Sequence, residues 1–237
     1  MTRHVLICLP DCDFDPTEVA TPWHRLREAG FRVTFATEQA AVAAADRLLL
    51  TGVVFGKLGA ESGALERYYR MVQSAEFQHP RRWRDIAVAE FDALLLPGGH
   101  AQGMKQYLES LDLRAIIQQF FAAQKIVAAI CHGVLAVART PTPASGLSVL
   151  NGYKVTALLT VMERAAYYAT FWKLGKYYRT YPEYVQQEVT RNLANKKDFI
   201  AGDVPWKPFA LRDRNVITAR YPKDAEIFAA EIIAALA

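Results

Sequence analysis

Short apolar runs alternate with amphipathic stretches along most of this chain. The apolar runs predict buried strands at residues 4–9, 31–36, 92–96, 125–130 and 216–218. The amphipathic stretches predict helices at residues 22–29, 61–74, 113–123 and 225–236, with a further helix running from position 133 to Arg139. Alternation of this kind is typical of parallel βαβ units. The pattern therefore predicts an α/β fold with a doubly wound, mostly parallel sheet and helices on both faces.

Two segments are longer than the connections of a minimal βαβ pattern. Residues 38–90 separate the second and third predicted strands, and residues 164–207 are rich in tyrosine. Connections of this length inside a compact domain usually serve a function, for example as a lid. We expect one domain spanning 1–237, in which 38–90 and 164–207 are lid or cap insertions. Most of the tyrosines should pack a small helical cap, and some should line a pocket.

Composition and charge exclude several classes of protein. Of 237 residues, 52% are apolar and 22% charged, which is typical of a globular chain and not of a disordered one. The net charge of +4 includes no Lys/Arg block longer than two residues, so no nucleic-acid partner is expected. The longest apolar stretch, 126–138, is interrupted by His132 and is too short to span a bilayer. Three cysteines and an acidic start that resembles no signal peptide predict reduced thiols and a cytoplasmic location.

A cysteine stands at the corner between a predicted strand and the helix after it. Cys131 and His132 follow directly on the strand at 125–130. A turn tight enough to expose one side chain needs small neighbours, which Ala129 and Gly133 provide. At a helix N-terminus, free N–H groups and the helix dipole favour a thiolate, and they could also hold a substrate oxyanion. Cys131 is therefore the candidate nucleophile, with an ordinary buried thiol as the alternative.

A glycine turn should lie beside this cysteine. Gly98, Gly99 and His100 leave the strand predicted at 92–96, and glycine there lets the backbone approach a ligand. In parallel sheets, ligands bind at the carboxyl ends of the strands. These residues and Cys131 are therefore expected at one edge of the sheet.

Glu18 follows the first predicted strand and should reach the same edge. Asp15 and Pro16 resemble a helix cap followed by proline at the first helical position, which would place Glu18 in a first helical turn. Pro22 argues against a helix that begins there, because it would interrupt the helix within two turns. Glu18 could then lie on a short turn aimed at the thiol.

The positions of the histidines limit the choice of a base. The five are His4, His24, His79, His100 and His132. A cysteine-type glutamine amidotransferase needs a His-x-Glu pair well downstream of its nucleophile, and no histidine follows position 132. That class is excluded. The base is His132, or else His100 or His24 brought near by folding.

Together these motifs resemble the ThiJ/PfpI superfamily, whose members have an amidotransferase-like, flavodoxin-like fold. The resemblance rests on Glu18, on the turn at 97–100, on the corner at 129–133 and on the closing segment at 217–222. It covers the core and leaves the two insertions as additions. Within the superfamily the chain is most similar to the stress chaperones with glutathione-independent glyoxalase (glyoxalase III) or deglycase activity.

The resemblance implies a triad of Cys131, His132 and an acidic residue about thirty positions later, after a Val-Thr-containing strand. Here residues 154–158 contain that Val-Thr pair, and Glu163 follows. Glu163 is thus implied as the acid that orients His132, with an exposed helix carboxylate as the alternative. Position 101 is alanine where this branch commonly has glycine, and the second insertion is not its usual cap. The identity of the substrate therefore stays open.

The resemblance also implies a mechanism and a partner. The Cys131 thiolate would add to the aldehyde of methylglyoxal, His132 would move a proton through an enediol, and lactate would leave without metal, cofactor or glutathione. The N–H groups of Gly99 and His132 would hold the oxyanion, with Gly98 and His100 beside them. Glu18 would donate a hydrogen bond to the sulfur, which requires a raised pKa at Glu18. A homodimer is possible, as in the superfamily.

Two other functions stay open at this point. A cysteine amidase or peptidase-type hydrolase would need an activated water near His132. A redox-sensing stress chaperone would use Cys131 as an oxidisable thiol without turnover. The expected ligand is a small carbonyl or amide compound. No metal site is predicted, because no His pair at i, i+4 and no Cys-x-x-Cys occurs.

Overall fold

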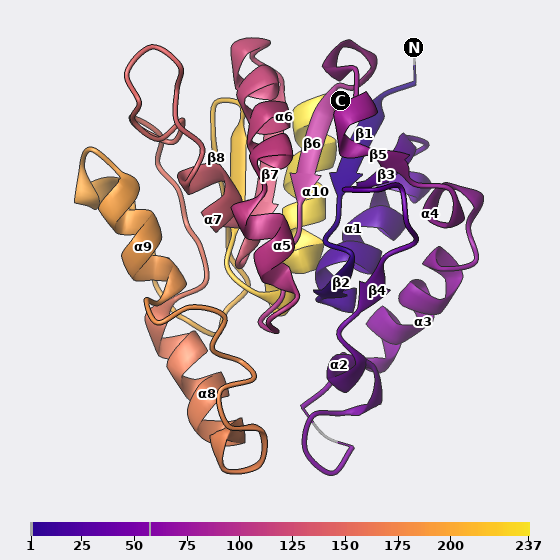
Figure 1. Ribbon diagram of the computed structural model, residues 1–237, viewed down its shortest axis with the longest axis vertical. Coiled ribbons are helices and arrows are strands. Elements are labelled where there is room, and N and C mark those ends of the chain that lie inside the picture. Colours follow the sequence, from indigo (N-terminus) through magenta and orange to yellow (C-terminus); the bar gives the residue numbers. More distant parts are fainter. Residues whose placement is uncertain (1, 57) are drawn as a thin grey trace.

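The computed structural model describes residues 2–56 and 58–237. At its centre is a seven-stranded sheet in the order β5-β3-β1-β6-β7-β9-β8 (Figure 1). Its parallel strands are β5 (Arg81–Arg82), β3 (Arg32–Thr37), β1 (His4–Cys8), β6 (Ala93–Leu96), β7 (Ile126–Ile130) and β9 (Val216–Ala219). The edge strand β8 (Ala210–Asp213) runs antiparallel to β9. The predicted doubly wound α/β sheet is confirmed.

The predicted strands agree with the observed ones to within one or two residues at each end. β1, β6 and β9 are buried along their whole length, as expected for strands covered on both faces. One expectation was wrong. The Val-Thr segment at 154–158 forms no strand, and only Val155 makes an isolated bridge, to Phe199. The free edge of β9 is taken by β8, so this segment has no place in the sheet.

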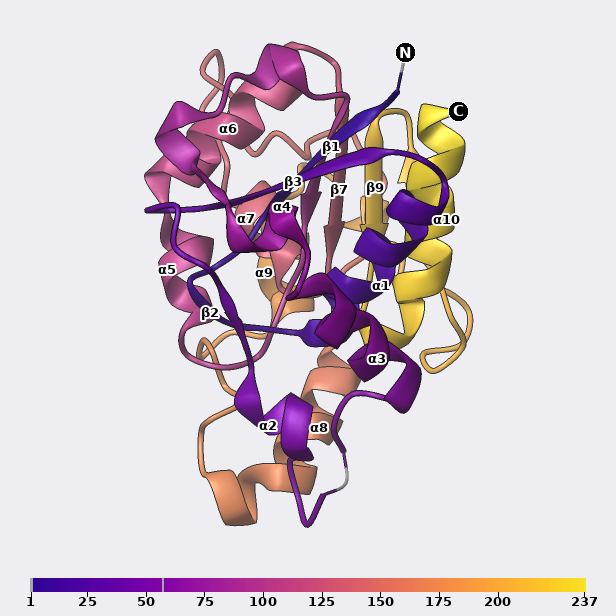
Figure 2. The same ribbon diagram turned by 90° about the vertical axis from the view of Figure 1, so that its right-hand side faces the viewer.

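Helices cover both faces of the sheet. Figure 2 shows α5 (Met104–Glu109), α6 (Leu111–Ala122) and α7 (Gly133–Ala138) on one side, and α1 (Pro16–Glu28) and α10 (Ala225–Leu236) on the other. On that second side α1 packs against both α10 and α3 (Ser62–Met71). Among the described residues, no helix is both long enough and apolar enough to cross a membrane.

The first helix begins earlier than predicted. The side chain of Asp15 accepts the backbone N–H groups of Thr17 and Glu18, and α1 starts at Pro16. Pro22 lies inside the helix instead of starting it. The proline lacks only one N–H, and burial of the apolar face of α1 outweighs that loss. Glu18 therefore lies in the first helical turn, and the alternative of a separate short turn was wrong.

The first insertion, residues 38–90, adds short elements beside the sheet. It contains β4 (Ala44–Ala45), α2 (Arg47–Thr51), α3, α4 (Ala75–Gln78), β5 and two 3-10 turns, Trp83–Asp85 and Val88–Glu90. β4 pairs with β2 (Cys12–Phe14) in a small parallel sheet. Of the other two cysteines, Cys12 begins β2 and is exposed, whereas Cys8 in β1 is fully buried.

The second insertion, residues 164–207, is only partly packed. Its helices are α8 (Thr160–Leu174), which starts just before it, and α9 (Val185–Asn192), followed by a 3-10 turn at Lys196–Asp198. On α8 the side chains of Tyr168, Phe171 and Trp172 are about half exposed, so the expected packing does not hold for them. Tyr178, by contrast, is buried.

Candidate active site

Cys131 occupies a strained corner between β7 and α7, which we call the elbow (residues 129–133). Its φ is 57°, in the left-handed region that non-glycine residues seldom adopt. Its backbone N–H donates to the Ala219 carbonyl across the sheet, at 3.1 Å. Gly133 is required here, because a Cβ on it would lie 2.2 Å from the Leu96 carbonyl oxygen. The elbow is thus pressed against the end of β6.

Glu18 and Gly98 complete the surroundings of the thiol. Glu18 is fully buried, and its Oε2 accepts the Gly98 N–H at 2.8 Å. A Cβ on Gly98 would lie 2.8 Å from the Cys131 Cβ and 2.7 Å from the His132 backbone nitrogen. Only glycine allows three segments to approach this closely. The predicted convergence of the three strand ends is therefore observed.

Burial sets the protonation of the two acidic groups in this site. It raises the pKa of Glu18 well above its usual value, and the nearby carboxyl of Asp15 raises it further. A neutral Glu18 can donate a hydrogen bond, and its Oε1 has no other partner among the described residues. Burial also raises the pKa of the Cys131 thiol, more than the His132 N–H lowers it. The expected resting thiolate was wrong, because the sulfur is enclosed beside a carboxyl group.

His132 is placed to take the proton from this thiol. Its Nδ1 lies 3.5 Å from the Cys131 Sγ, and its Nε2 lies 3.4 Å from Thr180 Oγ1. The Thr180 hydroxyl donates its single proton to the His100 carbonyl, at 2.5 Å. Thr180 must therefore accept from His132 Nε2–H, which leaves Nδ1 unprotonated and facing the sulfur. Burial and the neighbouring His100 lower the pKa of His132, so its imidazole is neutral.

Glu163 does not contact His132, contrary to the expectation. Its two oxygens accept from Arg179 Nη1 and from the Val185 backbone N–H, each at 3.0 Å. Burial raises the pKa of Glu163 to about 7 despite the nearby arginine. The carboxyl group anchors the segment that carries Thr180 and so reaches His132 only indirectly. Spacing along the chain could not reveal this, because α8 directs Glu163 toward the second insertion.

The remaining candidate residues are His100, Gly99 and His24. The His100 ring centroid is 4.8 Å from that of His132, and enclosure lowers the pKa of His100 to about 4. A Cβ on Gly99 would lie 2.4 Å from the Asp13 carbonyl oxygen, so close packing also requires this glycine. Its role in holding an oxyanion stays a prediction. His24 instead faces Glu28 on α1, at 3.4 Å, and is not the base.

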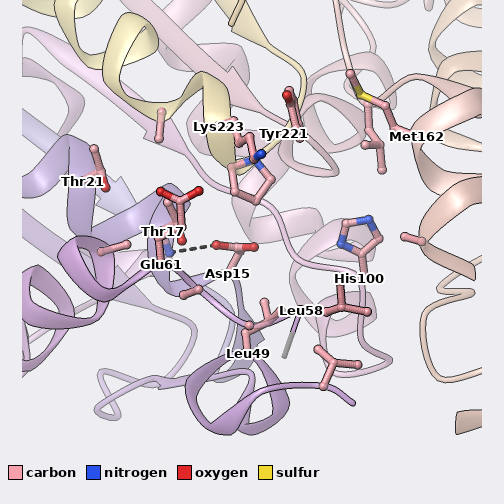
Figure 3. A pocket seen from close by; sticks show the side chains of 18 of the residues that line it. Asp15, Thr17, Thr21, Leu49, Leu58, Glu61, His100, Met162, Tyr221 and Lys223 are labelled. Atoms are coloured by element: carbon pink, nitrogen blue, oxygen red, sulfur yellow. Dashed lines mark hydrogen bonds between the residues drawn. The ribbon is translucent and has the colours of Figure 1, made fainter. Parts of the chain in front are cut away.

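A pocket of about 820 Å³ opens next to the elbow. Figure 3 shows side chains from the core and from the first insertion around it, including Asp15, His100, Leu49 and Leu58. Ala166 and Tyr178 of the second insertion also line it. Cys131 is not among the lining residues, but His100 is, and its ligating nitrogen lies within 4.8 Å of the Cys131 sulfur. Both insertions therefore border the approach to the elbow, while their action as a lid stays a prediction.

Side-chain hydrogen bonds join the two insertions above this pocket. Asp46, in the first insertion, accepts the Tyr177 hydroxyl at 3.2 Å and the Tyr178 hydroxyl at 3.3 Å. Tyr178 lines the pocket, and its ring lies edge-on to His100 with centroids 5.8 Å apart. The insertions thus meet the active site through Tyr178. No local pattern in the sequence indicates Thr180 or Asp46, so neither was predicted as a site residue.

Three side chains in the site could hold a metal ion. Ligating atoms of His100, Cys131 and His132 all lie within 4.8 Å of one another. Imidazole and thiolate suit zinc, which in catalytic sites has three protein ligands. Local spacings along the sequence do not reveal a trio of ligands that only folding brings together. The absence of a metal cofactor stays a prediction.

Comparison with known proteins establishes the family. A family model described as ThiJ/PfpI family-like matches residues 9–198, which include Glu18, the elbow and Glu163. This chain belongs to the ThiJ/PfpI family. The resemblance inferred from the motifs is confirmed.

Three ThiJ/PfpI relatives illustrate the range of similarity. An uncharacterized protein of Schizosaccharomyces pombe is 32% identical to this chain over 174 residues. The match covers 70% of this chain and 62% of the yeast protein, which is less than two thirds of the yeast protein. Protein/nucleic acid deglycase 2 of Escherichia coli is 28% identical over 68% of this chain and 74% of its own length. Glyoxalase 3 of Candida albicans is 21% identical over 92% of this chain and 87% of its own length.

A solved structure shares the fold of this chain. The crystal structure of glyoxalase III from Candida albicans has a TM-score of 0.74 with this chain at 21% sequence identity. The match covers 98% of this chain and 97% of that structure.

Proposed function

We propose that this ThiJ/PfpI protein is a cysteine-dependent enzyme that converts reactive 2-oxoaldehydes, such as methylglyoxal, into 2-hydroxy acids without glutathione. The observation that carries the proposal is the pairing of the Cys131 thiol with a neutral His132, whose free Nδ1 faces the sulfur at 3.5 Å. The relative named Glyoxalase 3 supports a glyoxalase reaction.

The reaction begins with the addition of the thiol to the aldehyde. As the C–S bond forms, the thiol proton passes to His132 Nδ1 and from there to the aldehyde oxygen, which gives a hemithioacetal and a neutral His132. A neutral Glu18 donates to the sulfur, and the His132 backbone N–H, which lowers the thiol pKa, assists at the same atom. The enclosure of Cys131 excludes bulk water from this step.

The product then arises by proton transfer within the adduct. His132 removes the proton from the aldehyde carbon and delivers one to the neighbouring carbon through an enediol, which leaves a thioester on Cys131. Water cleaves the thioester, so that methylglyoxal and one water give lactate and the free thiol. The aldehyde carbon is oxidised and the adjacent carbonyl carbon is reduced, so no external oxidant is needed.

The proposal is tested with Cys131→Ser and with Cys12→Ser, which alters the exposed thiol, as the matched control. Methylglyoxal loss and lactate formation are measured together. We expect Cys131→Ser to lose at least about a thousandfold in turnover and Cys12→Ser to match the wild type. An absence of Cys131-dependent lactate formation by the wild type would refute the proposal.

The same two variants separate the two alternative functions. A cysteine hydrolase would release ammonia or amine from simple amides in a Cys131-dependent manner. A redox sensor would lose its Cys131 thiol to peroxide without turning over any substrate.

A further inference from the structure

The pocket beside the elbow is larger than methylglyoxal requires. Its volume is about 820 Å³, in the range of about 300–1,000 Å³ that usually holds drug-sized ligands. Methylglyoxal is a three-carbon molecule and would leave most of this space unfilled. We propose that the pocket binds the apolar tail of a longer 2-oxoaldehyde, so that the preferred substrate has an alkyl chain of several carbons. This inference rests on the proposed function.

Apolar side chains from two directions form the pocket wall. On α8, Met162, Ala166 and Ala169 recur at helical spacing and line the pocket together. Leu49 of α2 and Ala64 of α3 line it from the first insertion. The alanines leave the width that a chain of methylenes needs.

The charged side chains around the pocket do not favour a substrate with an ionic tail. Arg67 and Lys223 line the pocket, but so do Glu61 and Glu226, and Arg67 is already paired with Glu226. Both signs therefore occur near the rim, and no group of like charges is present to recognise a phosphate or a carboxylate. The dominant feature is the apolar wall, which recognises hydrocarbon.

The polar end of the pocket directs the reactive head group to the elbow. His100 lines the pocket, and its ligating nitrogen lies within 4.8 Å of the Cys131 sulfur. A tail seated against α8 therefore leaves the carbonyl groups at His100. Cys131 itself is buried and does not line the pocket, so the head group must displace a side chain to reach the sulfur. The chemistry is unchanged, since a 2-oxoaldehyde and one water give a 2-hydroxy acid.

The experiment compares methylglyoxal with 2-oxooctanal, which carries five more methylene groups. Each fully buried methylene contributes about a fourfold gain in binding, so we expect kcat/KM for 2-oxooctanal to exceed that for methylglyoxal at least tenfold. Ala166→Phe fills the pocket and should lower kcat/KM for 2-oxooctanal about tenfold more than it lowers kcat/KM for methylglyoxal. Ala122→Phe, at an exposed alanine of α6, is the matched control and should change neither.

Two results would overturn the inference while leaving the proposed function intact. One is an equal or lower kcat/KM for 2-oxooctanal, and the other is an equal loss on both substrates in Ala166→Phe. If neither compound is turned over, the proposed function fails, and binding of the product decides about the pocket. Calorimetry should then show tighter binding of 2-hydroxyoctanoate than of lactate, with the difference lost in Ala166→Phe. No such difference would also overturn the inference.

Discussion

Two regions meet at His132 and are held in place by different means. The elbow is fixed by backbone packing, with the Gly133 Cα pressed against the Leu96 carbonyl and the Cys131 N–H bonded across the sheet. The segment that carries Thr180 is held by side chains instead, through Glu163 and Arg179. The proposed nucleophile and base therefore lie on the elbow at the end of β7, while the orientation of the proposed base depends on an insertion. Chemistry and specificity can thus change independently in this fold.

The largest effect is expected at the elbow itself. His132→Ala removes the group that accepts the thiol proton, and general acid–base catalysis of this kind contributes about 10²–10⁴-fold. We expect turnover of methylglyoxal to fall by that factor without disappearing. His79→Ala, at an exposed histidine, should leave the rate unchanged. A rate for His132→Ala close to that of the wild type would show that the base lies elsewhere.

The packing of the elbow is tested by replacing Gly133 with alanine. A Cβ at Gly133 would lie 2.2 Å from the Leu96 oxygen and 2.6 Å from the Pro97 oxygen, both of which belong to the backbone. We expect Gly133→Ala to lower the free energy of unfolding by about 3 kcal/mol or more. Gly63→Ala, where nothing lies within 4 Å of the added carbon, is the control and should be neutral or slightly stabilising. Urea denaturation measures both, and equal stabilities would contradict the tight contact.

The insertion should show its own dependence on pH. Burial raises the pKa of Glu163 to about 7 from 4.5, so its contribution to stability is complete below about pH 4.5 and is lost as the pH rises through 7. The stability of the wild type relative to Glu163→Gln should therefore fall by about 2–3 kcal/mol over that interval. Denaturation curves at several pH values measure it. If the difference in stability between the wild type and Glu163→Gln is the same at every pH, the pKa of Glu163 is not raised.

The smallest effect concerns the orientation of His132. Thr180→Val removes the oxygen that accepts from Nε2–H, and one neutral hydrogen bond contributes about 0.5–1.5 kcal/mol. We expect kcat to fall about three- to tenfold, with a shifted pH profile and little change in KM. Thr190→Val, in α9, is the matched control and should leave both unchanged. A greater loss of kcat in Glu163→Gln than in Thr180→Val would restore Glu163 as the main orienting group.

The core of this protein could be predicted from its sequence, and the insertions could not. β1, β6 and β7 are continuous apolar runs that end at Gly, Pro or Asp signals, so their ends were placed within one or two residues. Cys131 follows such an end directly, whereas Glu18 comes ten residues after the end of β1, in the first turn of α1. The pairing of Glu163 with His132 was wrong, because the direction of a helical side chain depends on how the helix packs. Thr180 lies in a tyrosine-rich stretch without periodicity, so nothing local indicated it.

The sequence by itself determined the five central strands of the sheet, the corner cysteine and the glycines that allow close approach, because each depends on short-range periodicity or on residue size. Only the tertiary structure decided three further properties: the neutral state of the Cys131 thiol, the hydrogen-bond partner of His132 and the size of the pocket. A pKa depends on how fully a group is removed from water, and a pocket depends on where two insertions come to rest. Both follow from contacts between residues far apart in the chain.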